Sequence, residues 1–347
     1  MMIIDDRLIG VGYPPYIIAE VSANHNGDIQ QALDTITMAK DMGADAVKIQ
    51  TYTPETMTIE CDNNDFKVLG GLWDGYSLFE LYKWAQTPFE WHEQLFQHAK
   101  KIGITLFSTP FDESAVDLLD SLDSPAYKIA SFEATDLPLI DYVSRKKKPM
   151  IVSTGLVNLE EIEDVVATIK QAGNNDFALL HCISSYPAPV NASNLKTILD
   201  MQARFSVSIG LSDHSKGVDV AIAAVALGAC IIEKHVTLDR NNGSPDAEFS
   251  LEPNELKELC ERSYNTWISL GVASYDRKSV EESSMKFRRS LYFVKNMAKG
   301  EVITDKHVRR IRPGYGLAPK HINNVIGKNA ARDISRGESV QWSSFHE

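Results

Sequence analysis

VSIGLSDHSKGVDVAIAAVALGACIIEKHVTL, residues 207–238, places a helical pattern between two short apolar runs. The runs VSIGLSD (207–213) and CIIEKHVTL (230–238) are rich in Ile and Val, which is typical of strands buried on both faces of a parallel sheet. The intervening VDVAIAAVALGA is long enough to be the crossover helix that parallel strands require. The stretch therefore predicts a strand–helix–strand unit.

The same unit recurs along the chain. Six earlier apolar runs, most of them followed by a helical pattern, are YIIAEVS (16–22), DAVKIQTY (45–52), ITLFSTPF (104–111), AYKIASF (126–132), PMIVSTG (149–155) and FALLHCIS (177–184). Eight strands alternating with helices over about 270 residues predict an α/β fold, a (β/α)8 TIM barrel. A doubly wound open sheet is the alternative, but the GxGxxG that usually follows its first strand is missing.

After Gly271 the alternation of strands and helices ends. We therefore expect a catalytic barrel over residues 1–271, a polar linker over 272–286 and a small separate domain over 287–347. A domain of about 60 residues is marginal as an independent core, so it is expected to dock onto the barrel or a partner chain.

Composition excludes several classes of function. A formal net charge of -12 disfavours a general nucleic-acid binder. No apolar run approaches the ~20 residues of a membrane span, and the N-terminus lacks the basic and apolar regions of a secretory signal. The four cysteines are scattered, which fits a reducing compartment. We expect a cytoplasmic protein without a membrane or nucleic-acid partner.

Polar side chains gather at the predicted C-terminal ends of the strands, where TIM barrels place their active sites. Buried strands do not tolerate so many polar groups without partners. The strand-end groups that we consider as candidates are Glu20, Lys48, Gln50, Ser108, Thr109, Phe111, Lys128, Ser131, Glu133, Ser153, Thr154, His181, Ser184, Tyr186, Ser212, Asp213, His214, Glu233, Lys234 and His235.

Ser212, Asp213 and His214 look like a nucleophilic triad, but alternation along a strand turns Asp213 away from the other two.

Two histidines at neighbouring strand ends suggest a metal site. His214 shares its strand face with Ser212, and His235 ends the neighbouring strand, so both imidazoles can reach one ion. Two histidines, a nearby carboxylate such as Asp246 and waters suit Mn²⁺ or Mg²⁺ better than structural zinc. The alternative is that His214 and His235 bind no metal and are hydrogen-bonded residues of the core.

Two lysines at strand ends suggest an anion site. Lys48 or Lys128 could form a Schiff base, but a Schiff-base aldolase needs no metal. Together they are typical of a clamp for a phosphorylated carboxylate, although a lysine can also simply reach solvent. Hydroxyl groups expected beside them complete such a clamp: Thr109, Ser131, Ser153 and Ser212.

Two other segments could contribute to the site. Residues 53–88 form an unusually long connection, which is usually functional. Its aromatic residues could wall a pocket or belong to an extra helix packed on the barrel rim: Trp73, Tyr76, Phe79, Tyr82 and Trp84. In RRIRPGYG (309–316), Arg312 precedes a rigid turn and is either a surface residue or a finger presented to an active site.

The order of these motifs resembles the sialic-acid synthase family across nearly the whole chain. The motifs are IIAEVSANHNGD, VKIQTY, YKIASFE, IVSTG, LHCISSYPAP, IGLSDHS, IEKHVTLD and RPGYG. Residues 287–347 resemble the family's antifreeze-like (SAF) domain. GGLWDG…LYKWAQTPFEWH most resembles the branch that uses 2,4-diacetamido-2,4,6-trideoxy-altropyranose; the N-acetylneuraminate and legionaminate branches are alternatives.

The resemblance implies a transferase that condenses phosphoenolpyruvate with an N-acylated amino sugar, giving a nine-carbon 2-keto acid and phosphate. It implies that His214 and His235 hold Mn²⁺ or Mg²⁺, with Co²⁺ a further candidate, and that Glu20 and Glu133 are catalytic. The implied phosphoenolpyruvate ligands are Lys48, Thr109, Lys128, Ser131, Ser153, Ser212 and Ser184, where the sialic-acid branch carries Asn. The implied sugar ligands are Glu20, Gln50, Phe111, Tyr186, Asp246, Phe293 and, reaching across a domain-swapped homodimer, Arg312.

Two other classes of function remain open. A metal-dependent aldolase would use free pyruvate and release no phosphate. A non-catalytic sugar-binding or antifreeze-type protein would follow from the tail alone, but it leaves the polar strand ends unexplained.

Overall fold

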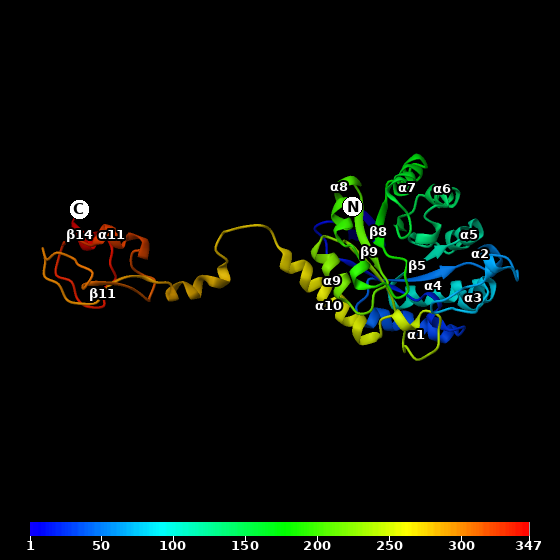
Figure 1. Cartoon of the computed structure of the whole chain (residues 1–347), viewed down its shortest axis with the longest axis horizontal. Coiled ribbons are helices and arrows are strands. Elements are labelled where there is room, and N and C mark those ends of the chain that lie inside the picture. The colour runs from blue at the N-terminus through cyan, green and yellow to red at the C-terminus, as the bar shows by residue number, and fades with distance from the viewer. Residues whose placement is uncertain (347) are drawn as a thin grey trace. The chain divides into compact units, whose positions relative to one another are not determined.

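A computed structural model describes residues 1–346, and its larger unit is a closed barrel of eight parallel strands (Figure 1). β10 pairs with both β9 and β3, which closes the sheet. The predicted fold class is confirmed, with strands somewhat shorter than the apolar runs. They are β3 (Tyr16–Glu20), β4 (Ala46–Thr51), β5 (Thr105–Pro110), β6 (Tyr127–Ile129), β7 (Met150–Ser153), β8 (Phe177–Cys182), β9 (Ser208–Asp213) and β10 (Ile231–His235).

Amphipathic helices surround the strands, and their apolar faces form one core with the outward side chains of the barrel. The start of α7 shows how local sequence sets a helix end: the Asn158 side chain accepts from the Glu161 amide, and Glu161 reaches back to the Asn158 amide. The helices are α1 (Ile29–Asp41), α4 (His92–Ile102), α5 (Glu113–Ser121), α6 (Leu137–Arg145), α7 (Leu159–Gln171), α8 (Lys196–Arg204), α9 (Asp219–Ala226) and α10 (Pro253–Leu270).

A second, smaller core fills the lower part of the barrel interior. The N-terminal hairpin, β1 (Met2–Ile4) and β2 (Arg7–Ile9), contributes Met2, Ile4 and Ile9 to it. These side chains cluster with inward residues of the strands, among them Ile18 and Phe107. Apolar packing thus closes one end of the barrel and leaves the C-terminal ends of the strands for polar chemistry.

The long connection between β4 and α4 is not an open loop. It contains α2 (Pro54–Met57) and α3 (Leu78–Ala85), together with short 3-10 turns. Two indole N–H groups attach it to the barrel unit: Trp73 donates to the Pro245 carbonyl at 3.0 Å, and Trp84 donates to Asn26 Oδ1 at 3.2 Å.

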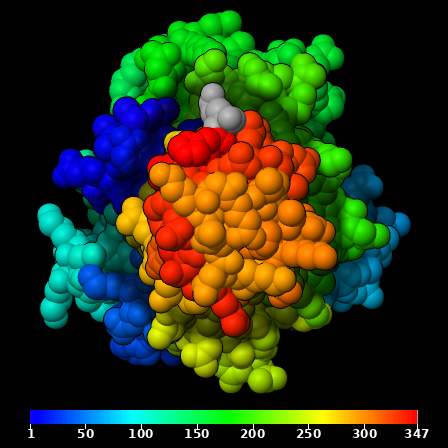
Figure 2. Space-filling view, turned by 90° about the vertical axis from the view of Figure 1, so that its left-hand side faces the viewer, coloured from blue at the N-terminus to red at the C-terminus, as the bar shows by residue number. Residues whose placement is uncertain are grey.

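A second compact unit begins at Val272 and has its own core. The predicted linker is not wholly irregular, because a 3-10 helix covers Ser279–Phe287. The unit then consists of β11 (Ser290–Phe293), β12 (Val308–Ile311), α11 (Ile322–Val325), β13 (Asn329–Ala330) and β14 (Phe345–His346). Figure 2 shows one face of this unit in orange and red.

Across residues 1–346, no helix combines the length and the apolar character needed to cross a bilayer. Cys61, Cys182, Cys230 and Cys260 are all free thiols.

Candidate active site

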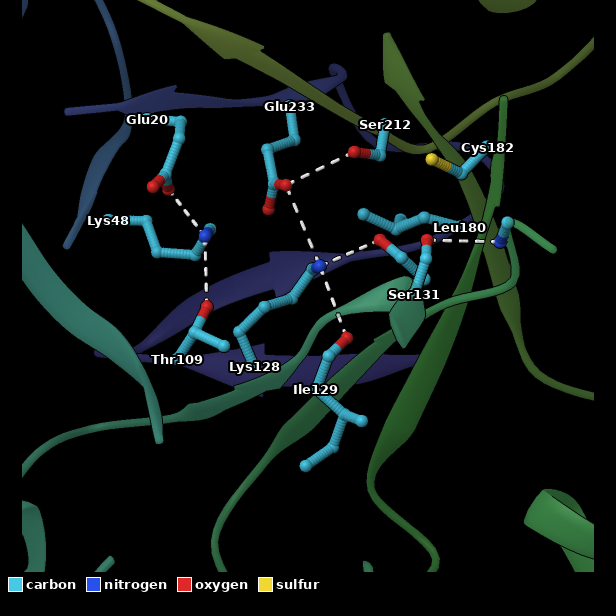
Figure 3. Close-up of polar contacts among 12 residues, drawn as sticks. Glu20, Lys48, Thr109, Lys128, Ile129, Ser131, Leu180, Cys182, Ser212 and Glu233 are labelled. Carbon is cyan, nitrogen blue, oxygen red and sulfur yellow. Dashed lines mark hydrogen bonds and ion pairs between the residues drawn. The ribbon is translucent and has the colours of Figure 1, made fainter. Parts of the chain in front are cut away.

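The two-residue period of the strands places a polar layer above the apolar floor of the barrel. Each of the eight strands contributes one inward side chain to this layer. Their order around the barrel, partly visible in Figure 3, is Glu20, Lys48, Thr109, Lys128, Ser153, Cys182, Ser212 and Glu233. All eight are buried, so each must find its partners inside the layer.

The first ion pair of the layer joins β3 and β4. Lys48 Nζ lies 2.5 Å from Glu20 Oε2 and donates to Thr109 Oγ1 at 2.9 Å (Figure 3). Burial raises the pKa of Glu20 to about 7, although the charge of Lys48 opposes that rise. Burial disfavours the charge of Lys48, but the carboxylates of Glu20 and Glu233 outweigh it and raise the pKa of Lys48.

The second ion pair joins β6 and β10. Lys128 Nζ lies 3.6 Å from Glu233 Oε1 and donates to Ser153 Oγ at 2.6 Å. Ser212 donates to the same Glu233 oxygen at 3.2 Å, and Glu233 Oε2 has no hydrogen-bond partner. Burial lowers the pKa of Lys128. The layer thus holds two buried lysines and two buried glutamates in two ion pairs. Removing one member of a pair would leave its partner as a buried charge without a counter-ion.

A cradle for a small anion lies beside Lys128. Ser131 starts the 3-10 turn Ser131–Glu133, and the Gly155 amide donates to its Oγ at 3.0 Å. A Cβ on Gly155 would stand 2.3 Å from Ser184 Oγ and 2.7 Å from Ser131 Oγ, so any larger residue there would displace these hydroxyls. Two hydroxyls thus converge at the end of β7, and the Gly155 amide holds one of them in place, so that both can donate to an oxyanion.

The two predicted histidine ligands lie together. Their ring centroids are 5.4 Å apart, and His235 Nδ1 is buried without a hydrogen-bond partner, 3.8 Å from Asp246 Oδ2. Burial, followed by the charge of His214, holds the pKa of His235 well below its usual range, which keeps the imidazole neutral for a metal. Burial opposes the charge of His214, but contacts with Cys182 raise the pKa of His214.

The side chains present fit a two-histidine cation site in donor chemistry. Among residues 1–346, however, no three His, Cys, Asp or Glu side chains converge closely enough to enclose an ion by themselves. A cation held there would complete its coordination with water or substrate oxygens.

Asp213 takes no part in a triad. It points outward, where Lys234 Nζ donates to its Oδ2 at 2.9 Å and the Ser215 amide donates to its Oδ1. The prediction that strand alternation separates Asp213 from Ser212 and His214 is therefore confirmed. His181 is likewise turned away, and its Nε2 lies 2.7 Å from the Ser193 carbonyl.

A cavity of about 350 Å³ lies above the polar layer and brings most predicted site residues together. The predicted residues that line it are Lys48, Gln50, Phe111, Lys128, Ser131, Glu133, Ser153, Tyr186, Ser212, His214, His235 and Asp246. The long connection supplies much of the opposite wall, which is mainly apolar: Met57, Val68, Trp73, Leu78, Leu81, Tyr82 and Ala85. The cavity therefore has a charged floor and an apolar wall.

Three predicted ligands, Glu20, Thr109 and Ser184, do not line the cavity themselves but lie next to residues that do. Glu20 and Thr109 lie beneath Lys48 and position its ammonium group. Ser184 supplies the second hydroxyl of the cradle, with its Oγ 3.9 Å from Cys182 Sγ. Their contacts suit them to orient the anion-binding groups.

Glu133 lines the cavity next to the cradle. Its Oε2 is buried without a hydrogen-bond partner, and burial raises the pKa of Glu133 to about 7. A carboxyl group with this pKa can give or take a proton near neutral pH, as an acid/base catalyst must.

Phe293 and Arg312, the two predicted sugar ligands in the C-terminal unit, differ in their exposure to solvent. Phe293 is only 1% exposed and packs in the core of that unit with Leu291 and Val308. Its assignment as a sugar ligand is therefore corrected to a core residue, because a ring so enclosed has no face left for a sugar. Arg312 is exposed.

Three residues of the site had no predicted role. Glu233 carries one of the two ion pairs, Cys182 contacts His214, and Tyr52 lines the cavity. Glu233 was already a strand-end candidate, and the strand face that it shares with His235 was the signal for it. The partners that define the other two roles come from distant segments.

The fold and the site define a class: a TIM-barrel enzyme with a floor of paired lysines and carboxylates at the C-terminal ends of its strands. A model of the NeuB family matches residues 35–275, and a model of the SAF domain matches residues 288–345. The chain belongs to the NeuB family.

Several relatives match nearly the whole chain. Pseudaminic acid synthase of Campylobacter jejuni subsp. jejuni serotype O:23/36 is 43% identical over 330 residues, 95% of this chain and 96% of the relative. Pseudaminic acid synthase of Helicobacter pylori is 40% identical over 92% of this chain and 94% of the relative. The crystal structure of the N-acetylneuraminic acid synthetase of Leptospira borgpetersenii superposes with a TM-score of 0.74 at 32% identity, over 83% of this chain and 95% of that one.

Proposed function

We propose that the chain is a pseudaminic acid synthase. It condenses phosphoenolpyruvate with 2,4-diacetamido-2,4,6-trideoxy-altropyranose to give pseudaminic acid and phosphate. The observation that carries this proposal is the division of the cavity into a charged floor and an apolar wall. The floor suits phosphoenolpyruvate, and the wall suits a sugar with a methyl group where other sugars carry a hydroxymethyl group. The relatives named pseudaminic acid synthase, at 40% and 43% identity, support this choice of sugar.

Lys48, Lys128 and the cradle of Ser131 and Gly155 are the groups that would bind phosphoenolpyruvate. The ammonium groups neutralise its phosphate and carboxylate, while the hydroxyl groups beside them fix its orientation. Fixed in this way, its C3 faces the sugar aldehyde, and orientation alone lowers the barrier to reaction by several kcal/mol.

His214 and His235 would hold a divalent cation, Mn²⁺ or Mg²⁺ with Co²⁺ as a further candidate. When bound, the cation supplies Lewis acidity that polarises the aldehyde of the open-chain sugar. Tyr186, Gln50 and Asp246 line the same part of the cavity and are suited to orient the sugar hydroxyl and acylamino groups.

The chemistry needs one proton delivered and one removed. C3 of phosphoenolpyruvate bonds to the aldehyde carbon, and the aldehyde oxygen takes a proton. Water then adds to C2 and loses a proton, and phosphate leaves as the C–O bond breaks. Glu133 is the group that the cavity offers for both transfers, giving its proton in the first step and regaining one in the second.

We further propose a homodimer in the cytoplasm in which Arg312 reaches the partner's sugar site. Its exposure and its position in the SAF domain support this role. The free thiols of all four cysteines are compatible with a reducing compartment.

Phosphate release tests the proposed function. Purified protein with Mn²⁺ and phosphoenolpyruvate is expected to release phosphate with the diacetamido-altrose sugar, and more slowly with N-acetylmannosamine or the legionaminate precursor. A metal-dependent aldolase would instead use pyruvate and release none. If no sugar of the panel caused phosphate release, the synthase assignment would fail; faster turnover of N-acetylmannosamine would move the chain to another branch.

The pH profile tests the role of Glu133. Its pKa of about 7 means that the carboxyl is protonated below pH 7 and ionised above it. Because the first step needs the protonated form, kcat/KM is expected to fall as pH rises through about 7. Glu133→Gln should lower kcat by roughly 10²-fold and remove this limb of the profile. A limb that survives in Glu133→Gln would assign the titration to another group.

A further inference from the structure

A second cavity, of about 270 Å³, adjoins the proposed substrate cavity. Trp73 and Pro245 line both cavities. Trp73 therefore stands between two spaces, one inside the proposed sugar site and one outside it.

A row of aromatic rings relates Trp73 to the histidine pair. The Tyr186 ring lies 4.4 Å from the His214 ring, and the Trp73 ring lies 5.7 Å from the Tyr186 ring, between centroids. The aldehyde carbon of the sugar is C1, and its neighbour C2 carries an acylamino group. If C1 stands at the histidines, Tyr186 is the first ring of this row within reach of an acyl group on C2, and Trp73 is the next.

The indole of Trp73 is held in place. Its Nε1–H donates to the Pro245 carbonyl at 3.0 Å, which ties the long β4–α4 connection to the segment that carries Asp246. Turning the indole aside would break this bond and the contact with Tyr186. Trp73 is thus a fixed wall rather than a mobile side chain.

The second cavity has a mixed lining, with aromatic rings on one side and polar groups such as Ser244 on another. Tyr76 and Trp84 stack at 5.6 Å with an interplanar angle of 20° and present aromatic surface to it. Arg240 also lines it, but its guanidinium is paired with Glu252 and Glu255 and donates to the Ser250 carbonyl. Glu248 is the other charged lining residue, and its carboxylate is paired with Lys216 at 2.9 Å. Among the described lining residues, both charges therefore already have partners within the protein.

We propose that Trp73 is a specificity-determining residue that limits the size of the acyl group on C2 of the sugar. The inference rests on the proposed function, because it places the sugar aldehyde at the histidine pair. An acetyl group ends at the indole. A longer acyl chain meets the indole, although space for it lies directly behind, in the second cavity.

Trp73→Ala joins the two cavities and tests the proposal. Steady-state phosphate release is measured with the N-acetyl sugar and with its N-butanoyl and N-hexanoyl analogues at C2. Wild type is expected to prefer acetyl. In Trp73→Ala, the ratio of kcat/KM for butanoyl over acetyl should rise at least about tenfold, the scale on which pockets discriminate apolar groups. Trp73→Phe loses the hydrogen bond but keeps most of the wall, so its ratio should change much less.

Leu72→Ala is the matched control, because Leu72 lines only the second cavity. It should leave both the acetyl activity and the ratio unchanged. An unchanged ratio in a folded, active Trp73→Ala protein would overturn the inference while the proposed function stands. If Trp73→Ala fails to fold, Trp73→Leu gives the same comparison with a smaller opening. Wild type inactive with every sugar would instead overturn the proposed function.

Discussion

Lys128→Met is expected to lower kcat/KM for phosphoenolpyruvate by roughly a thousandfold, or about 4 kcal/mol. Lys128 is the buried cation between Ser153 and Glu233 on the cavity floor. Its loss removes a positive charge from the proposed anion site and leaves the buried Glu233 carboxylate without its ion-pair partner. For the second reason the free energy of unfolding should also fall, by about 3–5 kcal/mol. Phosphate-release kinetics and urea unfolding measure the two effects.

The double variant Lys128→Met/Glu233→Gln separates these two causes. It removes both charges of the pair, so most of the lost stability should return. The affinity for phosphoenolpyruvate should not return, because the cation that the anion needs is still missing. Recovery of both properties in the double variant would show that Lys128 serves the fold and not the substrate.

The barrel could be predicted from the sequence because its signals are local. A parallel strand buried on both faces is a short apolar run, and each such run reappears as a strand within one to three residues of its predicted ends. Period-two alternation also predicted correctly which side chains face inward, as Ser212 and His214 show on either side of Asp213.

The pairing of charges within the site could not be predicted in the same way. Lys128 and Glu233 are more than a hundred residues apart and meet only because the sheet closes into a barrel. Glu233 has the same local pattern as any carboxylate near a strand end, so its role as the counter-ion of Lys128 depends on tertiary structure.

The role of the long β4–α4 connection could be predicted only in part. Its aromatic content predicted a pocket wall, and Trp73 and Tyr82 do line the cavity. Tyr76 and Trp84 instead stack on each other and line the neighbouring space, while residues 78–85 also form the extra helix of the alternative interpretation. Composition indicates that such a segment packs on the rim, but tertiary contacts, such as the hydrogen bond from Trp73 to the Pro245 carbonyl, decide which rings face the cavity.

Removing divalent cations is expected to lower the rate of phosphate release by roughly a thousandfold, and Mn²⁺ should restore it. The expectation rests on the proposed cation site, where buried His235 keeps a neutral imidazole with an unpartnered Nδ1 beside His214. A cation that binds only the folded chain also stabilises it, by about 2.7 kcal/mol at a hundred times its Kd. Mn²⁺ should therefore raise the Tm of the substrate-free protein.

Two histidine variants test whether the Mn²⁺-dependent activity and the Mn²⁺-dependent rise in Tm both arise at the proposed cation site. His235→Ala should abolish the Mn²⁺-dependent rise in Tm together with the activity. His98→Ala should leave both intact, because His98 lies on α4 and contacts Thr37. The Tm measurement is needed because it reports cation binding without turnover. If His235→Ala lost activity but its Tm still rose with Mn²⁺, the cation would bind at another site. Full activity after exhaustive chelation, with no Tm response in wild type, would assign the two histidines to direct hydrogen bonding of the sugar, the plainer role that their burial also allows.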